Sequence, residues 1–192
     1  MSTSMVKGNP LKLMLHFALP LLIGNLLQQT YNIIDAAIVG QILGAKALAS
    51  VGASSSVQFL VLGFCMGSCT GFGVPVAKYF GGNNLEKMRD YIFNGAVLVG
   101  IIAAVVTTIC AVFCPQILHL LSVPEDIFEG AYAYLIVIFL GIPFTLMYNY
   151  LSSVLRSVGD SRTPFIFLAF SACLNIFLDL FCIVVLKWGC AG

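Results

Sequence analysis

Long apolar stretches without any charge alternate with short polar connections along this chain. Three of these stretches, residues 47–77, 91–124 and 130–155, contain no Asp, Glu, Lys or Arg. Each can supply the ~20 residues that an α-helix needs to cross ~30 Å of hydrocarbon. The pattern predicts five membrane-spanning helices. They are expected at approximately residues 13–39, 52–78, 91–114, 131–154 and 164–187.

The composition excludes a soluble domain. Of the 192 residues, 60% are hydrophobic and only 9% are charged, whereas a soluble domain carries about 25% charged residues. A net charge of +1 without any basic run gives no reason to expect a nucleic-acid partner. The apolar stretch that begins at Leu13 is too long for the core of a signal peptide. The chain is therefore expected to be an all-α integral membrane protein in a lipid bilayer, without a cofactor.

The positions of Lys and Arg predict the orientation of the spans, because cytoplasmic connections carry an excess of positive charge. If five spans alternate, seven basic residues fall on one side and the remaining two, Lys46 and Lys187, on the other. The seven are Lys7, Lys12, Lys78, Lys87, Arg89, Arg156 and Arg162. This bias predicts a multi-pass protein of the cell (inner or plasma) membrane with a cytoplasmic N-terminus. The first, third and fifth spans then run outward.

A polar stripe marks the first expected span. It consists of Asn25, Gln28, Asn32 and Asp35, at spacings of 3, 4 and 3 residues. Because successive helical residues are turned by 100°, these four side chains lie on one side of the helix. A membrane helix with such a stripe does not face lipid on that side. It faces other helices or a water-filled cavity.

A second acidic residue lies in the fifth expected span, where Asn175 and Asp179 share a helix face at i and i+4. The first and fifth spans run in the same direction, so Asp35 and Asp179 can lie at similar depth. An Asp at the centre of a membrane helix costs ~2.5–3.5 kcal/mol, which favours a shared functional site. The alternative is that each acid pairs locally with neighbouring polar groups and only holds helices together.

Other features of the expected spans bear on movement and on a cavity. Pro20 removes a backbone hydrogen bond from the first span, which predicts either a fixed kink or a hinge. In the second span, Gly63, Gly67 and Gly71 recur every four residues, which predicts that a neighbouring helix approaches closely, in a static or a sliding contact. The fourth span presents a polar face that bonds to other helices or lines a cavity. That face consists of Thr145, Asn149 and Ser152, with Tyr148 beside it.

Two carboxylates in a membrane can bind a cation, hold and release a proton, or activate water for peptide hydrolysis. The last reaction belongs to intramembrane aspartyl proteases, which use YD and GxGD motifs. Here Ile34 precedes Asp35 and Leu178 precedes Asp179, so neither motif is present. A transporter is therefore favoured over an enzyme. Lys and Arg occur in the expected spans only as the last residues of two of them, Lys78 and Lys187, and not in their interior, which favours a cationic or neutral substrate over a polyanionic one.

Four segments, in order, resemble the MATE (multidrug and toxic compound extrusion) family. They are YNIIDAAIVGQILGAKALASVG, YFGGNNLEKMRDY, LRSVGDSRTP and LNIFLD. The resemblance implies a fold of twelve helices in two six-helix lobes. Residues 1–192 would form most of the N-terminal lobe, and its partners would be helix 6 and the C-terminal lobe of the same protein.

The resemblance also implies a function: export of amphipathic, mostly cationic organic compounds, driven by inward flow of Na⁺ or H⁺. The family's cation-site positions fall here on Asp35, Asn175 and Asp179, and its helix 1 bend falls on Pro20. Asn25, Gln28, Asn32, Tyr148 and Asn149 are candidates for lining the cavity. Two alternatives stay open, namely a lipid or polysaccharide exporter of the wider superfamily and an inactive, truncated membrane protein.

Overall fold

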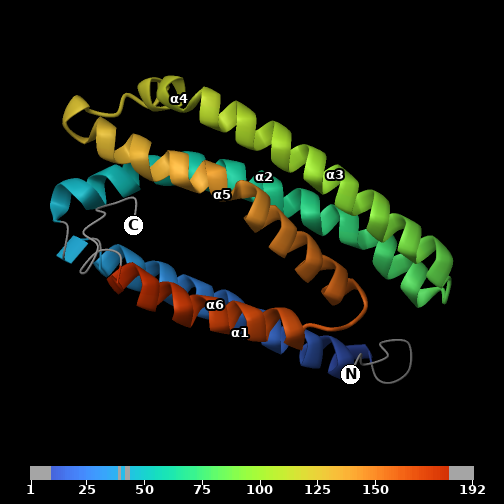
Figure 1. Ribbon diagram of the computed structural model, residues 1–192. Coiled ribbons are helices and arrows are strands. Elements are labelled where there is room, and N and C mark those ends of the chain that lie inside the picture. The colour runs from blue at the N-terminus through green and yellow to red at the C-terminus, as the bar shows by residue number, and fades with distance from the viewer. Residues whose placement is uncertain (1–9, 39, 42–43, 182–192) are drawn as a thin grey trace.

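The computed structural model describes residues 10–38, 40–41 and 44–181. Side chains of residues 10, 35, 38, 45–47, 179 and 180 are outside this description. The described residues form six α-helices without a strand (Figure 1). The helices are α1 (Pro10–Ile38), α2 (Ala45–Gly81), α3 (Leu85–Val112), α4 (Cys114–Leu120), α5 (Glu125–Ser157) and α6 (Arg162–Leu180).

The five expected spans correspond to α1, α2, α3, α5 and α6. Four of these helices are long and apolar enough to cross a membrane, and the described part of α6 is apolar but shorter. All five begin earlier than the apolar pattern suggested, because their first turns lie in the polar connections. The start of α3 illustrates this. Asn84 caps that helix by accepting a hydrogen bond from the backbone N–H of Lys87 at 3.1 Å, so α3 begins at Leu85.

A densely packed group of helices, α2, α3 and α5, contains the core. We call it the α2–α3–α5 block. Its completely buried side chains include Cys65 and Cys69 of α2 and Leu135, Phe139 and Ile142 of α5. Hydrogen bonds between helices join the block near both of its ends. They are Ser50 Oγ to Ile127 O (3.2 Å), Ser157 Oγ to Gly73 O (2.8 Å) and Tyr150 OH to Ile92 O (2.6 Å).

Small residues allow close approach inside the block, but at other positions than predicted. Space for an added Cβ is missing at Gly73, against Ser153, and at Gly95, against the ring of Tyr150. At Gly63, Gly67 and Gly71, by contrast, no described atom lies within 4 Å of such a Cβ. The expected close contact along that stripe is therefore wrong for the part of the chain that the structure describes. The spacing identified a face of small residues but not its neighbour.

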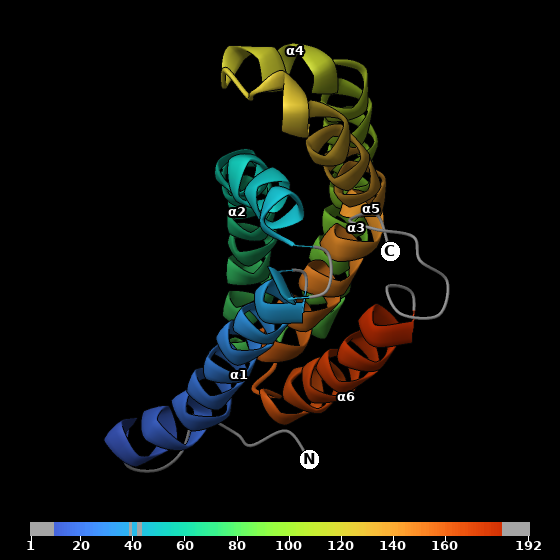
Figure 2. The same cartoon turned by 90° about the vertical axis from the view of Figure 1, so that its left-hand side faces the viewer.

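The helices α1 and α6 pack chiefly against each other, and we call them the α1–α6 pair. They run in the same direction and lie together on one side of the block (Figures 1 and 2). At Gly24 the helices are close, since an added Cβ would lie 3.4 Å from Leu168 Cδ2 and 3.5 Å from Phe165 Cδ2. In the apolar stretch that could cross a membrane, only 6% of the residues of α1 are buried, against 28% of those of α5. The pair is thus thinly covered compared with the block.

The polar connections separate into two groups at opposite ends of the molecule. The start of α1, the α2–α3 turn and the α5–α6 turn lie at one end (Figure 1). The short helix α4, the end of α1 and the start of α2 lie at the other end. This is the alternation expected of consecutive spans, and it gathers the basic residues Lys78, Lys87, Arg156 and Arg162 at one end.

Candidate functional site: a cavity between two groups of helices

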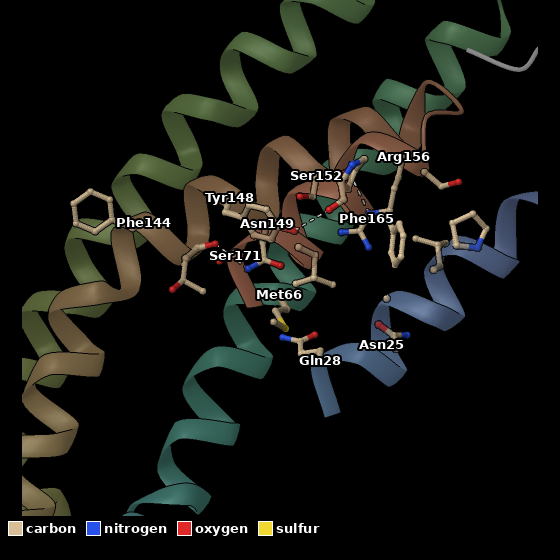
Figure 3. Close-up of a pocket in the computed structure, with 17 residues that line it drawn as sticks. Asn25, Gln28, Met66, Phe144, Tyr148, Asn149, Ser152, Arg156, Phe165 and Ser171 are labelled. Carbon is tan, nitrogen blue, oxygen red and sulfur yellow. Dashed lines mark hydrogen bonds between the residues drawn. The ribbon is translucent and has the colours of Figure 1, made fainter. Parts of the chain in front are cut away.

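A cavity of about 420 Å³ lies between the α1–α6 pair and the α2–α3–α5 block. Figure 3 shows side chains from α1, α5 and α6 around it, with Met66 of α2 at its edge. Its lining residues are Pro20, Leu21, Gly24, Asn25, Gln28, Met66, Phe144, Thr145, Tyr148, Asn149, Ser152, Arg156, Ser161, Pro164, Phe165, Leu168 and Ser171. The location is significant because any movement of the pair against the block changes the shape of this cavity.

The polar lining comes from facing helices. Asn25 and Gln28 belong to the stripe of α1, and Tyr148 and Asn149 to the polar face of α5 (Figure 3). Two contacts position the α5 groups. Asn149 Nδ2 donates to Thr145 O at 2.8 Å, and Tyr148 OH donates to the carbonyl oxygen of Pro164 at 3.3 Å, which links α5 to the start of α6. The lining combines these amide groups with the aromatic rings of Phe144 and Phe165, which suits a ligand that is partly apolar.

Asn32 and Pro20, also candidates on α1, lie in different places relative to the cavity. Asn32 is exposed and lies outside the cavity lining, and its Nδ2 donates to Gln29 Oε1 at 3.2 Å. Pro20 lines the cavity, and α1 continues as an α-helix on both sides of it. The proline thus lies beside the cavity and before the polar stripe, where a bend would move the stripe.

Arg156 was missed as a lining residue. The apolar pattern predicts that the fourth span ends at residue 154 and that no basic side chain lies within it, which is wrong. Helix α5 continues to Ser157, and Arg156 lines the cavity with its Nε donating to Ser152 O at 3.1 Å. A signal was present, because Thr145, Asn149, Ser152 and Arg156 continue one helical face at spacings of 4, 3 and 4.

The turn between α5 and α6 sets the position of the α6 lining. Asp160 accepts hydrogen bonds from Arg162 N (3.1 Å), Thr163 N (3.0 Å) and Thr163 Oγ1 (2.7 Å). Mainly because of the side-chain hydrogen bond from Thr163, the pKa of Asp160 lies below its ordinary value. Nearby, Arg162 Nη2 lies 3.0 Å from His16 Nε2 of α1. A guanidinium group only donates, so His16 Nε2 accepts in this contact.

The expected cation-site residues lie toward the far ends of the pair. Asp35 is in the last turn of α1, and Asp179 is in the last turn of α6. The side chains of both acids are outside the described part of the structure. Asn175 is described, and its Oδ1 is buried without a hydrogen-bond partner among the described residues. A buried oxygen left unpaired costs about 1–3 kcal/mol, and such an oxygen suits a cation or a protonated carboxyl group.

Comparisons with known proteins agree with this architecture. A family model described as MatE matches residues 20–181. The chain is 35% identical over 186 residues, 97% of its length, to the probable multidrug resistance protein YpnP of Bacillus subtilis, and this covers 42% of that protein. It is 30% identical to the probable multidrug resistance protein YoeA of the same organism, over 84% of this chain and 35% of that one.

Solved structures show the same fold. A MOP superfamily transporter from Pyrococcus furiosus superposes with a TM-score of 0.92 at 23% identity, covering 100% of this chain and 43% of that chain. A crystal structure of MATE in the bent conformation gives a TM-score of 0.90 at 23% identity, with the same coverage. The 192 residues thus span less than half the length of these proteins.

Proposed function

Since this chain belongs to the MatE family, we propose that it forms one lobe of a cation-coupled exporter of amphipathic, mainly cationic organic compounds. The relatives' names support drug export, because YpnP and YoeA carry the description of probable multidrug resistance proteins. Helix 6 and a second lobe of the same protein complete the transporter in this proposal. The end of the molecule that gathers Lys and Arg faces the cytoplasm.

The observation that carries the proposal is the position of the polar chemistry. The stripe on α1 and the unpaired Oδ1 of Asn175 both belong to the α1–α6 pair, and the pair forms one wall of the cavity. Asp35, Asn175 and Asp179 bind Na⁺ or H⁺ toward the outer end of this wall. Cation binding bends α1 near Pro20 and moves the pair against the block, which changes the cavity and lowers its affinity for the compound. By linkage, the bound compound weakens cation binding by the same factor.

The test is efflux of ethidium from cells that express the protein from its complete reading frame. Asp35→Asn removes the charge with little change in size, and we expect it to abolish efflux at an unchanged level of protein in the membrane. Glu129→Gln is the matched control, because Glu129 is exposed on α5 outside the cavity lining, and it should retain efflux. Normal efflux by Asp35→Asn contradicts the proposal. Repeating the assay over a series of Na⁺ concentrations and pH values identifies the coupling ion.

A second candidate function is export of a lipid-linked or polysaccharide precursor. Arg156 favours it, because a guanidinium group in the cavity lining can pair with a phosphate or a carboxylate. The two functions differ in the expected effect of Arg156→Gln. This change leaves ethidium efflux intact if the exporter takes cationic drugs, and it abolishes transport of an anionic substrate that the arginine binds.

A further inference from the structure

A second cavity, of about 570 Å³, lies beside the α2–α3 turn and shares no lining residue with the first. This turn is at the end of the molecule that gathers the basic residues (Figure 1). Its lining comes from the last turns of α2 and the first turns of α3. The lining residues are Phe72, Pro75, Tyr79, Lys87, Asp90, Tyr91, Asn94, Gly95 and Leu98.

Two lysines lie near the ring of Tyr79, which lines this cavity; Lys87 lines the cavity too, whereas Lys78 lies outside its lining. Lys78 Nζ lies 5.9 Å and Lys87 Nζ 5.8 Å from the centre of the Tyr79 ring. The ring of Tyr91 is stacked on Tyr79, with 5.0 Å between centres and 21° between planes. One ring attracts a cation, but two ammonium groups around it repel each other. An anion bound between the lysines relieves this repulsion.

The cavity changes from apolar to polar along the helices. Phe72, Pro75 and Leu98 lie more than one turn inside α2 and α3, away from the connection between them, whereas Lys87 lies in the first turn of α3. A phospholipid has the same order, with acyl chains in the membrane and a phosphate at its surface. Asp90 also lines the cavity. Together, Lys78, Lys87 and Asp90 carry a formal charge of about +1, which suits a headgroup with one negative charge.

We propose that this cavity binds the phosphodiester headgroup of an anionic phospholipid such as phosphatidylglycerol. Lys78 and Lys87 pair with the phosphate, and one acyl chain lies against Phe72 and Leu98. The site is in the leaflet that faces the basic connections. Basic pockets between membrane helices bind anionic headgroups by this chemistry. The lipid is a bound ligand and not the exported compound, so the site is independent of the proposed transport function.

Lipid binding to the purified protein, expressed from its complete reading frame, tests the proposal. Native mass spectrometry measures the affinity of the protein in detergent micelles as dioleoyl-phosphatidylglycerol is added. Dioleoyl-phosphatidylcholine and inorganic phosphate are the two comparison ligands. We expect phosphatidylglycerol to bind more tightly than phosphatidylcholine, and inorganic phosphate not to compete. Each lysine contributes about fivefold, which corresponds to ~1 kcal/mol per basic residue near an anionic surface, so Lys78→Gln with Lys87→Gln weakens binding about 25-fold.

Arg89→Gln is the matched control. Arg89 is an exposed basic residue two positions after Lys87 that does not line the cavity. Lys78 and Lys87 both lie over the Tyr79 ring, and no such contact is described for Arg89, so its loss should leave phosphatidylglycerol binding within about twofold. Both lysines are exposed, and an unchanged unfolding temperature verifies that the double variant is folded. Equal binding of the two lipids, an equal loss in Arg89→Gln, or competition by inorganic phosphate at similar concentration each overturns the proposal.

Discussion

The α2–α3–α5 block and the α1–α6 pair are built in different ways. The block buries large aliphatic and aromatic side chains completely, such as Phe139 and Leu135. The pair exposes most of its large side chains, among them Ile33 of α1 and Phe170 of α6, at 70% and 68%. The polar stripe and the unpaired oxygen of Asn175 belong to the pair. The rigid packing is therefore on other helices than the candidate cation site, whereas the cavity lining comes from both groups.

This difference has a mechanical consequence. Close-packed interiors resist deformation, because a shift of a few tenths of an ångström already creates clashes. The pair meets the block across a cavity instead of a continuous core, so it can move with a smaller loss of contacts. A site that must alternate between two shapes is expected at such a boundary.

The largest expected difference in stability between the block and the pair is at two buried glycines, one in each. In the block, an added Cβ at Gly95 meets the Tyr150 ring, whose hydroxyl is fixed to Ile92 O at 2.6 Å. Gly95→Ala should therefore destabilise the protein by about 1–3 kcal/mol. In the pair, an added Cβ at Gly24 makes ordinary contacts with Leu168 and Phe165. Gly24→Ala should be neutral or gain up to about 1 kcal/mol from helix propensity.

The measurement is the thermal unfolding midpoint of each purified variant in the same detergent. Because both changes add one methyl group to a buried helical glycine, differences in hydrophobicity cancel. Equal destabilisation by the two changes would show that the pair is packed as tightly as the block, contrary to the comparison.

A smaller effect is expected at Asp160, which positions the start of α6. Asp160→Ala should cost about 1 kcal/mol, as is usual for loss of a helix cap. Because the pKa of Asp160 in the folded protein is lowered from 3.8, the charged carboxylate stabilises the fold above that pH. This contribution is lost as the pH falls below it, through the folded pKa.

The unfolding midpoints of the original protein and of Asp160→Ala, measured from pH 7 to pH 3, test this prediction. The difference between them should be constant above about pH 5 and shrink below the ordinary pKa of the carboxyl group. Asp160→Asn serves as the control, since an amide oxygen can still cap the helix. A difference that persists unchanged at the lowest pH would assign the effect of Asp160→Ala to something other than the charged cap.

The apolar pattern predicted five helices, of which four are long and apolar enough to cross a membrane in the described residues, because crossing a membrane requires an uninterrupted apolar length. It predicted their ends less well, since caps such as Asn84 lie in polar connections. The direction of α1 and α6 followed from the alternation of spans, and their packing against each other agrees with the expected shared depth of Asp35 and Asp179. Whether these acids form a cation site stays a prediction, because their side chains are outside the described residues.

The contacts between helices could not be predicted in the same way. One sequence shows which face of a helix is small or polar but not which helix it meets. Gly63, Gly67 and Gly71 therefore suggested a close contact that the described structure lacks. Arg156 was assigned to a connection because a charged residue ended the span, although its long side chain can line a cavity from the last turn of α5.

The proposed mechanism requires that the α1–α6 pair moves against the α2–α3–α5 block when a cation binds near Asp35. Double electron–electron resonance measures the distance between two spin labels and so detects this movement directly. The labels are attached to introduced cysteines in the protein expressed from its complete reading frame, after the other reactive cysteines have been replaced. One label pair joins Leu22 of α1 to Phe93 of α3, and the control pair joins Phe64 of α2 to Phe93, all at exposed positions. We predict that Na⁺ or acidification shifts the Leu22–Phe93 distance, that Asp35→Asn abolishes the shift, and that the control distance stays constant. A Leu22–Phe93 distance that neither Na⁺ nor acid changes would contradict the account.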